Sequence, residues 1–86
     1  YYKFIMWNEK NNTIQATFVF KDFAEAFGFM TKVAEEVETL NHHPTWTNTW
    51  NKIEIILTTH EKGNMVTEKD RQLAETIDVI YQQYVF

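Results

Sequence analysis

The spacing of apolar residues changes near residue 21, and this change limits the folds open to the chain. Between Thr13 and Phe20 apolar and other residues alternate, which is typical of a strand with one buried face. From Asp22 to Leu40 the spacing becomes helical, and Glu25 follows Asp22 at the distance found in a capping box. The pattern therefore predicts a strand followed directly by a helix of about 18 residues.

This helix carries a wider apolar surface than one sheet would cover, an arc of roughly 160°. The central stripe of the arc is formed by Phe23, Phe27, Met30, Ala34 and Val37. Phe29 and Val33 lie on the surplus side, which we expect to pack on a neighbouring helix or on a second subunit.

Three further strands and a second helix follow from the same kind of pattern. Alternation at Tyr2–Trp7 and a turn-rich stretch at Asn8–Asn12 predict a hairpin with the strand at Thr13–Phe20. Two more strands are predicted at Trp46–Trp50 and Lys52–His60, and a second capping box at Thr67–Asp70 begins a helix. The order β-β-α-β-β-α predicts one α+β domain over residues 1–86, an antiparallel sheet with helices on one face.

Two adjacent histidines stand where the first helix must end. Pro44 cannot continue a helix and disfavours helical geometry at His43 before it. Imidazole can both give and take a proton near neutrality, so His42 and His43 indicate an acid/base site. Glu38 precedes His42 by one helical turn and is expected to orient or charge-stabilise that ring, unless it is a solvated helix residue.

Other interpretations of the histidines remain open. A cationic histidine also interacts well with the C-terminal end of a helix, which would explain one of the pair. His42, His43 and His60 with Glu38 could instead bind a metal ion. Consecutive side chains diverge, however, and the i, i+4 histidine pair of helical zinc sites is missing, so we favour acid/base use and expect no metal. His60 alone fits a surface histidine before a turn.

Two further residues are candidates for the site. Asp70 falls within the apolar stripe of the second helix, formed by Leu73, Ile77 and Tyr81. A buried charge needs partners, and either the backbone amide of Thr67 or a ligand would supply them. Trp7 is either a core residue or a flat surface on which a heteroaromatic ligand stacks.

Composition excludes several classes of function. A net charge of −4 without a cluster of Lys or Arg argues against nucleic acid and anionic membranes as partners. The absence of cysteine excludes disulfides and thiolate metal sites, and no apolar run has the length of a membrane span. No signal peptide is visible, so we expect a cytoplasmic protein. Seven Phe, four Tyr and three Trp in 86 residues favour a homo-oligomer that buries some of these rings.

Several short motifs together resemble the signature of pterin-4a-carbinolamine dehydratases. The segments Phe20–Phe23 and Ala26–Thr31 are similar to that family's helix entry. The other matching residues are Glu38, His42-His43-Pro44, Trp46, Trp50, Asn51-Lys52-Ile53, Thr59-His60 and Thr67-Glu68-Lys69-Asp70. The loop Glu61–Val66 departs from the shorter form usual in the family, and the helix that usually precedes the Trp7 strand is missing or truncated in the given sequence.

The resemblance implies a four-stranded antiparallel sheet with helices on one side, assembled as a homodimer or homotetramer, and an activity without metal or cofactor. The implied reaction dehydrates 4a-hydroxytetrahydropterin to quinonoid dihydropterin, which recycles the tetrahydrobiopterin used by aromatic amino acid hydroxylases. Animal relatives also act as a dimerisation cofactor for a transcription factor, so a non-catalytic protein-binding module is the alternative.

The resemblance also implies a role for each site residue. His42 and His60 would transfer protons on opposite faces of the pterin, and His43 would chiefly bind substrate. Glu38 would orient His42, Asp70 would help to form the pocket, and Trp7 would stack on or flank the pterin ring.

Overall fold

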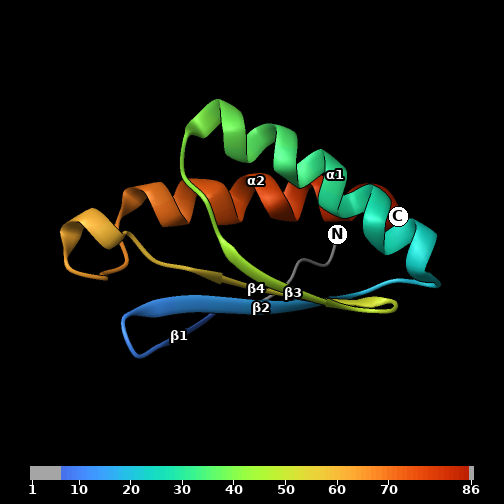
Figure 1. The fold of residues 1–86 in the computed structure, drawn as a ribbon, viewed down its shortest axis with the longest axis horizontal. Helices are drawn as coiled ribbons and strands as arrows, with labels where there is room; N and C mark the ends of the chain where they lie inside the picture. The colour runs from blue at the N-terminus through green and yellow to red at the C-terminus, as the bar shows by residue number, and fades with distance from the viewer. Residues whose placement is uncertain (1–6, 86) are drawn as a thin grey trace.

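The computed structural model describes residues 7–85 and confirms the predicted order of elements (Figure 1). A short 3₁₀ helix, His60–Lys62, lies between the last strand and the last helix. The strands and helices are β1 (Asn8–Lys10), β2 (Thr13–Val19), α1 (Phe23–Leu40), β3 (Thr45–Thr49), β4 (Lys52–Leu57) and α2 (Glu68–Val85).

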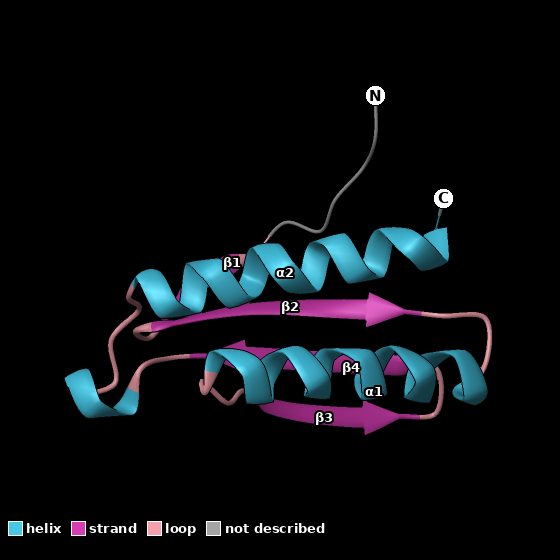
Figure 2. Cartoon of the chain, turned by 90° about the horizontal axis from the view of Figure 1, so that it is seen from above, coloured by secondary structure: helices cyan, strands magenta, loops and turns pink. Residues whose placement is uncertain are grey.

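The four strands form one antiparallel sheet in the order β1-β2-β4-β3, and both helices cover the same face of it. Figure 2 shows α1 over β3 and β4, whereas α2 runs along β1 and β2. The predicted α+β class and the one-sided arrangement of helices are therefore confirmed.

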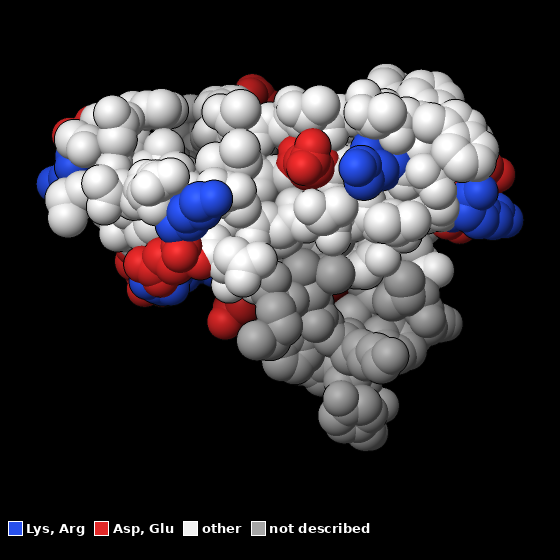
Figure 3. Space-filling view, turned by 90° about the horizontal axis from the view of Figure 1, so that it is seen from below, with Lys and Arg blue, Asp and Glu red and all other residues white. Residues whose placement is uncertain are grey.

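The core lies between the sheet and the two helices. The register of β2 and β4 forms the sheet side of this core. Phe18 pairs with Ile53 and Ala16 pairs with Ile55, so the inward residues of the two strands lie side by side. The opposite face carries the alternate residues, among them Thr17 beside Glu54. Figure 3 shows that this open face carries few charged side chains. The buried apolar residues are Ile14, Ala16, Phe18, Phe20, Ala26, Phe29, Val33, Val37, Ile53, Ile55, Leu57, Leu73, Ala74, Ile77 and Ile80.

The prediction for the central stripe of α1 is wrong at its first two aromatic residues. Phe23 and Phe27 are 46% and 53% exposed, whereas Phe29 is fully buried. The ring of Phe29 lies 5.9 Å from that of Tyr81 on α2, so the expected packing on a neighbouring helix is confirmed. Because α1 lies against both the sheet and α2, the buried part of its arc is turned toward α2.

The turn of the first hairpin is shorter than predicted. Tyr2–Met6, most of the expected first strand, lie outside the described residues. Residues 8–10, predicted as turn, form β1 instead, and the turn contracts to Asn11 and Asn12, whose φ angles are 51° and 62°. Asparagine tolerates this left-handed conformation, which two-residue hairpin turns require.

The fourth strand also ends early, at Leu57 rather than His60. None of the described helices combines the length and apolar character needed to cross a bilayer.

Candidate active site

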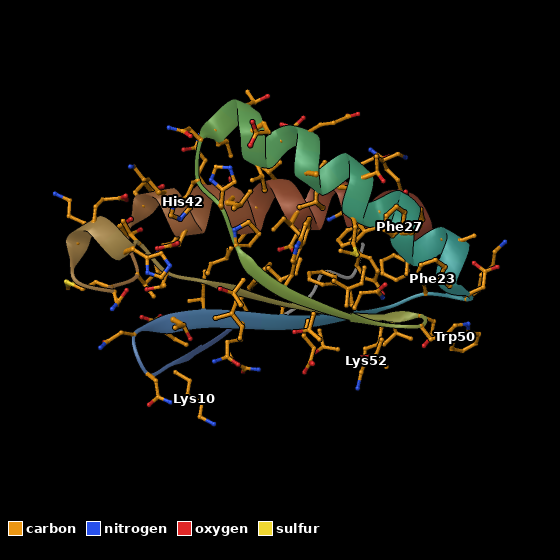
Figure 4. The ribbon with its side chains drawn as sticks, viewed as in Figure 1. Lys10, Phe23, Phe27, His42, Trp50 and Lys52 are labelled. Carbon is orange, nitrogen blue, oxygen red and sulfur yellow. The ribbon has the colours of Figure 1, made fainter. Side chains whose placement is uncertain are left out.

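His42 is directed into the protein by the way in which α1 ends. Asn41 adopts a left-handed conformation with φ 53°, and the N–H of His42 then donates to the carbonyl of Val37. This turn carries the imidazole beneath the end of the helix and beside α2, as Figure 4 shows. His42 is 7% exposed, so its hydrogen-bond partners within the protein determine which ring nitrogen carries the proton.

Asp70 is the partner of His42. Its Oδ1 lies 2.6 Å from Nε2 of the imidazole, and the carboxylate is fully buried in the first turn of α2. The second oxygen accepts from the backbone N–H of Thr67 and from the hydroxyl of Thr59, both at 2.8 Å. The expected contact with the Thr67 amide is therefore confirmed. The carboxylate gains two further donors, in keeping with the several kcal/mol that an unpaired buried charge would cost.

Thr59 was noted only as part of the Thr59-His60 motif, and sequence reasoning missed its role beside Asp70. It is 1% exposed and lies just beyond β4, and its hydroxyl lies 2.6 Å from that of Thr67. Since Thr59 donates to Asp70, Thr67 must donate to Thr59, which gives a directed chain of hydrogen bonds that ends on the carboxylate. A signal was present, because Thr59 continues the inward alternation of Ile53, Ile55 and Leu57 as a polar residue.

This arrangement selects one tautomer of His42. A carboxylate only accepts, so the neutral imidazole carries its proton on Nε2 and leaves the lone pair on Nδ1. Among the described residues no buried side-chain nitrogen or oxygen lacks a hydrogen-bond partner. Nδ1 of His42 makes no hydrogen bond within the described part of the chain, so it reaches the surface. The hydrogen bond to Asp70 therefore holds the ring on its buried side, and the nitrogen that can accept a proton faces solvent.

Glu38 does not contact His42, and this expectation is wrong. Its Oε2 lies 2.8 Å from Nε2 of His43, and the two side chains are 78% and 56% exposed. The prediction rested on the separation of one helical turn between Glu38 and His42, which brings two side chains together only while the backbone stays helical. Because Asn41 ends the helix, His42 turns inward and His43 turns outward over Glu38.

His60 lies next to the same network. It begins the 3₁₀ helix directly after Thr59, whose hydroxyl binds Asp70, so it is close in the fold to the His42 pair. The side chain is exposed, and its Nδ1 lies 2.7 Å from Oδ1 of Asn64. Segments from the end of α1, the end of β4 and the start of α2 therefore meet at this end of the molecule.

Trp7 lies just before β1 and contacts α2 at Asp78, away from Asp70. Its ring packs edge-on against Phe18, and its Nε1 donates to Asp78 at 3.0 Å. Asp78 follows Asp70 by eight residues, about 12 Å along the helix axis. The structure therefore gives Trp7 a half-buried, partly core position and does not bring it together with His42.

A cavity of about 230 Å³ lies beside Trp7, and none of the residues that line it is a histidine. Burial raises the pKa of Asp78 from 3.8 to about 6, the hydrogen bond from Trp7 opposes this rise, and nearby Glu75 adds to it. The residues lining the cavity are Trp7, Glu9, Ile14, Arg71, Ala74, Glu75 and Asp78. Across residues 7–85 there is no group of three or more His, Asp or Glu side chains placed to hold a metal ion.

Comparisons with known proteins agree with the fold and with the motif. A family model described as pterin 4 alpha carbinolamine dehydratase matches residues 3–80. A protein of Prochlorococcus marinus is 53% identical over 84% of this chain and 75% of its own length. A protein of Paraburkholderia xenovorans is 54% identical over 80% of this chain and 71% of its own length. Both are named, provisionally, pterin-4-alpha-carbinolamine dehydratases.

Two solved structures share the architecture. The crystal structure of a transcriptional coactivator/pterin dehydratase from Brucella melitensis matches with a TM-score of 0.83 and 40% identity, over 87% of this chain and 81% of its own. A pterin dehydratase-like protein, identified as a RuBisCO assembly factor in the alpha-carboxysome, matches with a TM-score of 0.73. At 19% identity, over 92% of this chain and 90% of its own, the second likeness supports the fold alone.

Proposed function

The chain belongs to the pterin 4 alpha carbinolamine dehydratase family, and from this premise we propose that it dehydrates a 4a-hydroxytetrahydropterin to the quinonoid dihydropterin. The product is the form that is recycled to tetrahydrobiopterin for aromatic amino acid hydroxylases. The observation that carries the proposal is the buried contact between Asp70 and His42, which places the proton of the neutral imidazole on Nε2 and leaves Nδ1 free to accept one.

The reaction needs one base and one acid. The proton on N5 of the pterin leaves, a double bond forms between N5 and C4a, and the C4a–O bond breaks as the hydroxyl oxygen takes up a proton and departs as water. We assign the base to Nδ1 of His42, because the carboxylate of Asp70 stabilises the imidazolium that forms there. We assign the acid to His60, which is exposed and follows Thr59 in the same network.

His43 and Glu38 are assigned to substrate binding. Their side chains share a hydrogen bond of 2.8 Å at the exposed end of α1, where both are open to solvent. The role of Trp7 beside the pterin ring is a separate proposal, since its contacts lie further along α2. An unchanged KM in Trp7→Phe would remove Trp7 from the binding site.

The direct test is the dehydration of 4a-hydroxytetrahydropterin by the purified protein and by His42→Ala. General acid/base groups contribute about 10²- to 10⁴-fold, so we expect the variant to lose activity on that scale. Equal rates for both proteins, no faster than buffer, would refute the proposed activity.

A second candidate function is a protein-binding or dimerisation module of the same fold. It is supported by exposed apolar rings at the end of the molecule opposite His42, where Figure 4 places Phe23, Phe27 and Trp50. These rings also support the proposal that the protein works as a homodimer or homotetramer. We further propose that it acts in the cytoplasm. Light scattering that finds only monomer at micromolar concentration would contradict self-association.

A further inference from the structure

The loop after β4 turns back on itself and brings one side chain onto His60. Gly63 and Asn64 both adopt left-handed conformations, with φ angles of 73° and 60°. Two backbone hydrogen bonds between Thr59 and Met65, at 2.9 and 3.4 Å, close the base of the loop. The amide of Asn64 consequently returns to the imidazole, and its Oδ1 lies 2.7 Å from Nδ1.

This contact determines which nitrogen of His60 is free. An amide carbonyl oxygen only accepts, so Nδ1 must carry a proton and Nε2 holds the lone pair when the ring is neutral. The orientation is opposite to that of His42, whose Nε2 is bound and whose Nδ1 is free. The two imidazoles therefore present different nitrogens, each selected by an oxygen acceptor on its other side.

We propose that Asn64 is a positioning residue for His60, which holds the ring by Nδ1 so that Nε2 exchanges the proton with substrate. The inference rests on the proposed function, in which protonated His60 passes its Nε2 proton to the departing hydroxyl. That transfer leaves a neutral ring with a proton on Nδ1, which is the tautomer that Asn64 binds. The bond to Asn64 is therefore kept in both protonation states, and the ring has the same orientation before and after the proton transfer.

A purely structural role for Asn64 would be to allow its left-handed backbone, and substitution by glycine separates the two roles. Glycine adopts this conformation freely, so Asn64→Gly removes the side chain without straining the turn. Asn64→Asp restores an oxygen acceptor in a residue that also tolerates the conformation. Asn12→Gly is the matched control, because Asn12 has a φ of 62° in the β1–β2 turn.

The readout is the tautomer of His60, from the ¹⁵N chemical shifts of its ring nitrogens at a pH at which the ring is neutral. We expect a protonated Nδ1 in the native protein and in Asn64→Asp, and a shift toward protonated Nε2 in Asn64→Gly. We expect kcat for dehydration to fall about 2- to 10-fold in Asn64→Gly, the size of one hydrogen bond. Asn64→Asp should recover kcat, and Asn12→Gly should change neither quantity.

Two results would overturn the proposal. One is a native His60 that carries its proton on Nε2, and the other is a tautomer that Asn64→Gly leaves unchanged. Neither result requires turnover, so both remain decisive if the native protein has no dehydratase activity. That last finding would refute the proposed function while the spectra still decide the role of Asn64.

Discussion

Replacing Asp70 by asparagine removes one charge from a fully buried carboxylate and keeps its size. The two donors to Oδ2, from Thr59 and Thr67, require an acceptor at that position. The new amide must therefore place its oxygen there and turn its NH₂ group toward His42. Because NH₂ only donates, Nε2 of His42 has to become the acceptor, and its proton moves to Nδ1.

The structural cost follows from the contacts that remain. All three hydrogen bonds to the carboxylate are between 2.6 and 2.8 Å. Each becomes a neutral bond worth about 1 kcal/mol less than a charge-assisted one, and the relief of burying a charge offsets part of the sum. We expect a loss of about 2 kcal/mol in the free energy of unfolding, or about 10 °C in Tm for a domain of this size.

The catalytic cost is larger than the structural one. In the proposed mechanism His42 accepts the N5 proton on Nδ1, which a ring already protonated there cannot do. We therefore expect Asp70→Asn to reduce kcat by about 10²- to 10⁴-fold while the protein remains folded. The assay is dehydration of 4a-hydroxytetrahydropterin, combined with ¹⁵N shifts of the His42 ring and with urea unfolding.

Asp22→Asn provides the control, since it makes the same change in the side chain that caps the first turn of α1, where asparagine caps equally well. Activity within about 3-fold of native in Asp70→Asn would refute the reasoning, because general acid/base groups contribute far more than that. A His42 ring that keeps its proton on Nε2 in this variant would refute it equally.

Three further predictions concern other parts of the molecule. The pKa of Asp78 rises on folding from 3.8 to about 6, so its ionisation lowers stability as pH rises through this range. Asp78→Asn should therefore gain about 1 kcal/mol over native in urea unfolding at pH 7.5 but not at pH 4, after allowance for solvent screening. Phe29→Ala should lose about 3 to 5 kcal/mol on thermal unfolding, whereas Phe27→Ser should change stability by less than about 1 kcal/mol. Glu38→Gln should raise KM through its contact with His43 and leave kcat nearly unchanged; an equal fall in kcat would contradict this assignment.

Most of the fold could be predicted from patterns of neighbouring residues in the sequence. The alternation in Thr13–Phe20 and the cap at Asp22 placed β2 and α1 correctly, because hydrogen bonding and burial at those positions are decided within a few residues. Which apolar residues of α1 are buried could not be predicted, since this depends on where α2 lies on the sheet. Phe29 is buried, and Phe27 is exposed, for that reason.

The site residues were found by their chemistry, but their pairing was not. The family resemblance implied that His42, His60 and Asp70 belong to one site, and burial of Asp70 implied that it needs partners. Which carboxylate meets which imidazole depends on a single left-handed residue, Asn41, that reverses the directions of the two side chains after it. A helical wheel cannot anticipate that reversal.

One carboxylate both starts α2 and orients the imidazole of His42. The amide of Thr67 is bound to one oxygen of this carboxylate and the His42 ring to the other, so a movement of the Asp70 side chain disturbs the first turn of α2 and the ring contact at the same time. Hydrogen exchange at this single amide therefore reports how often the His42 ring is released from inside. A ligand that settles against His42 should slow that exchange, which makes Thr67 a sensor of occupancy that requires no turnover.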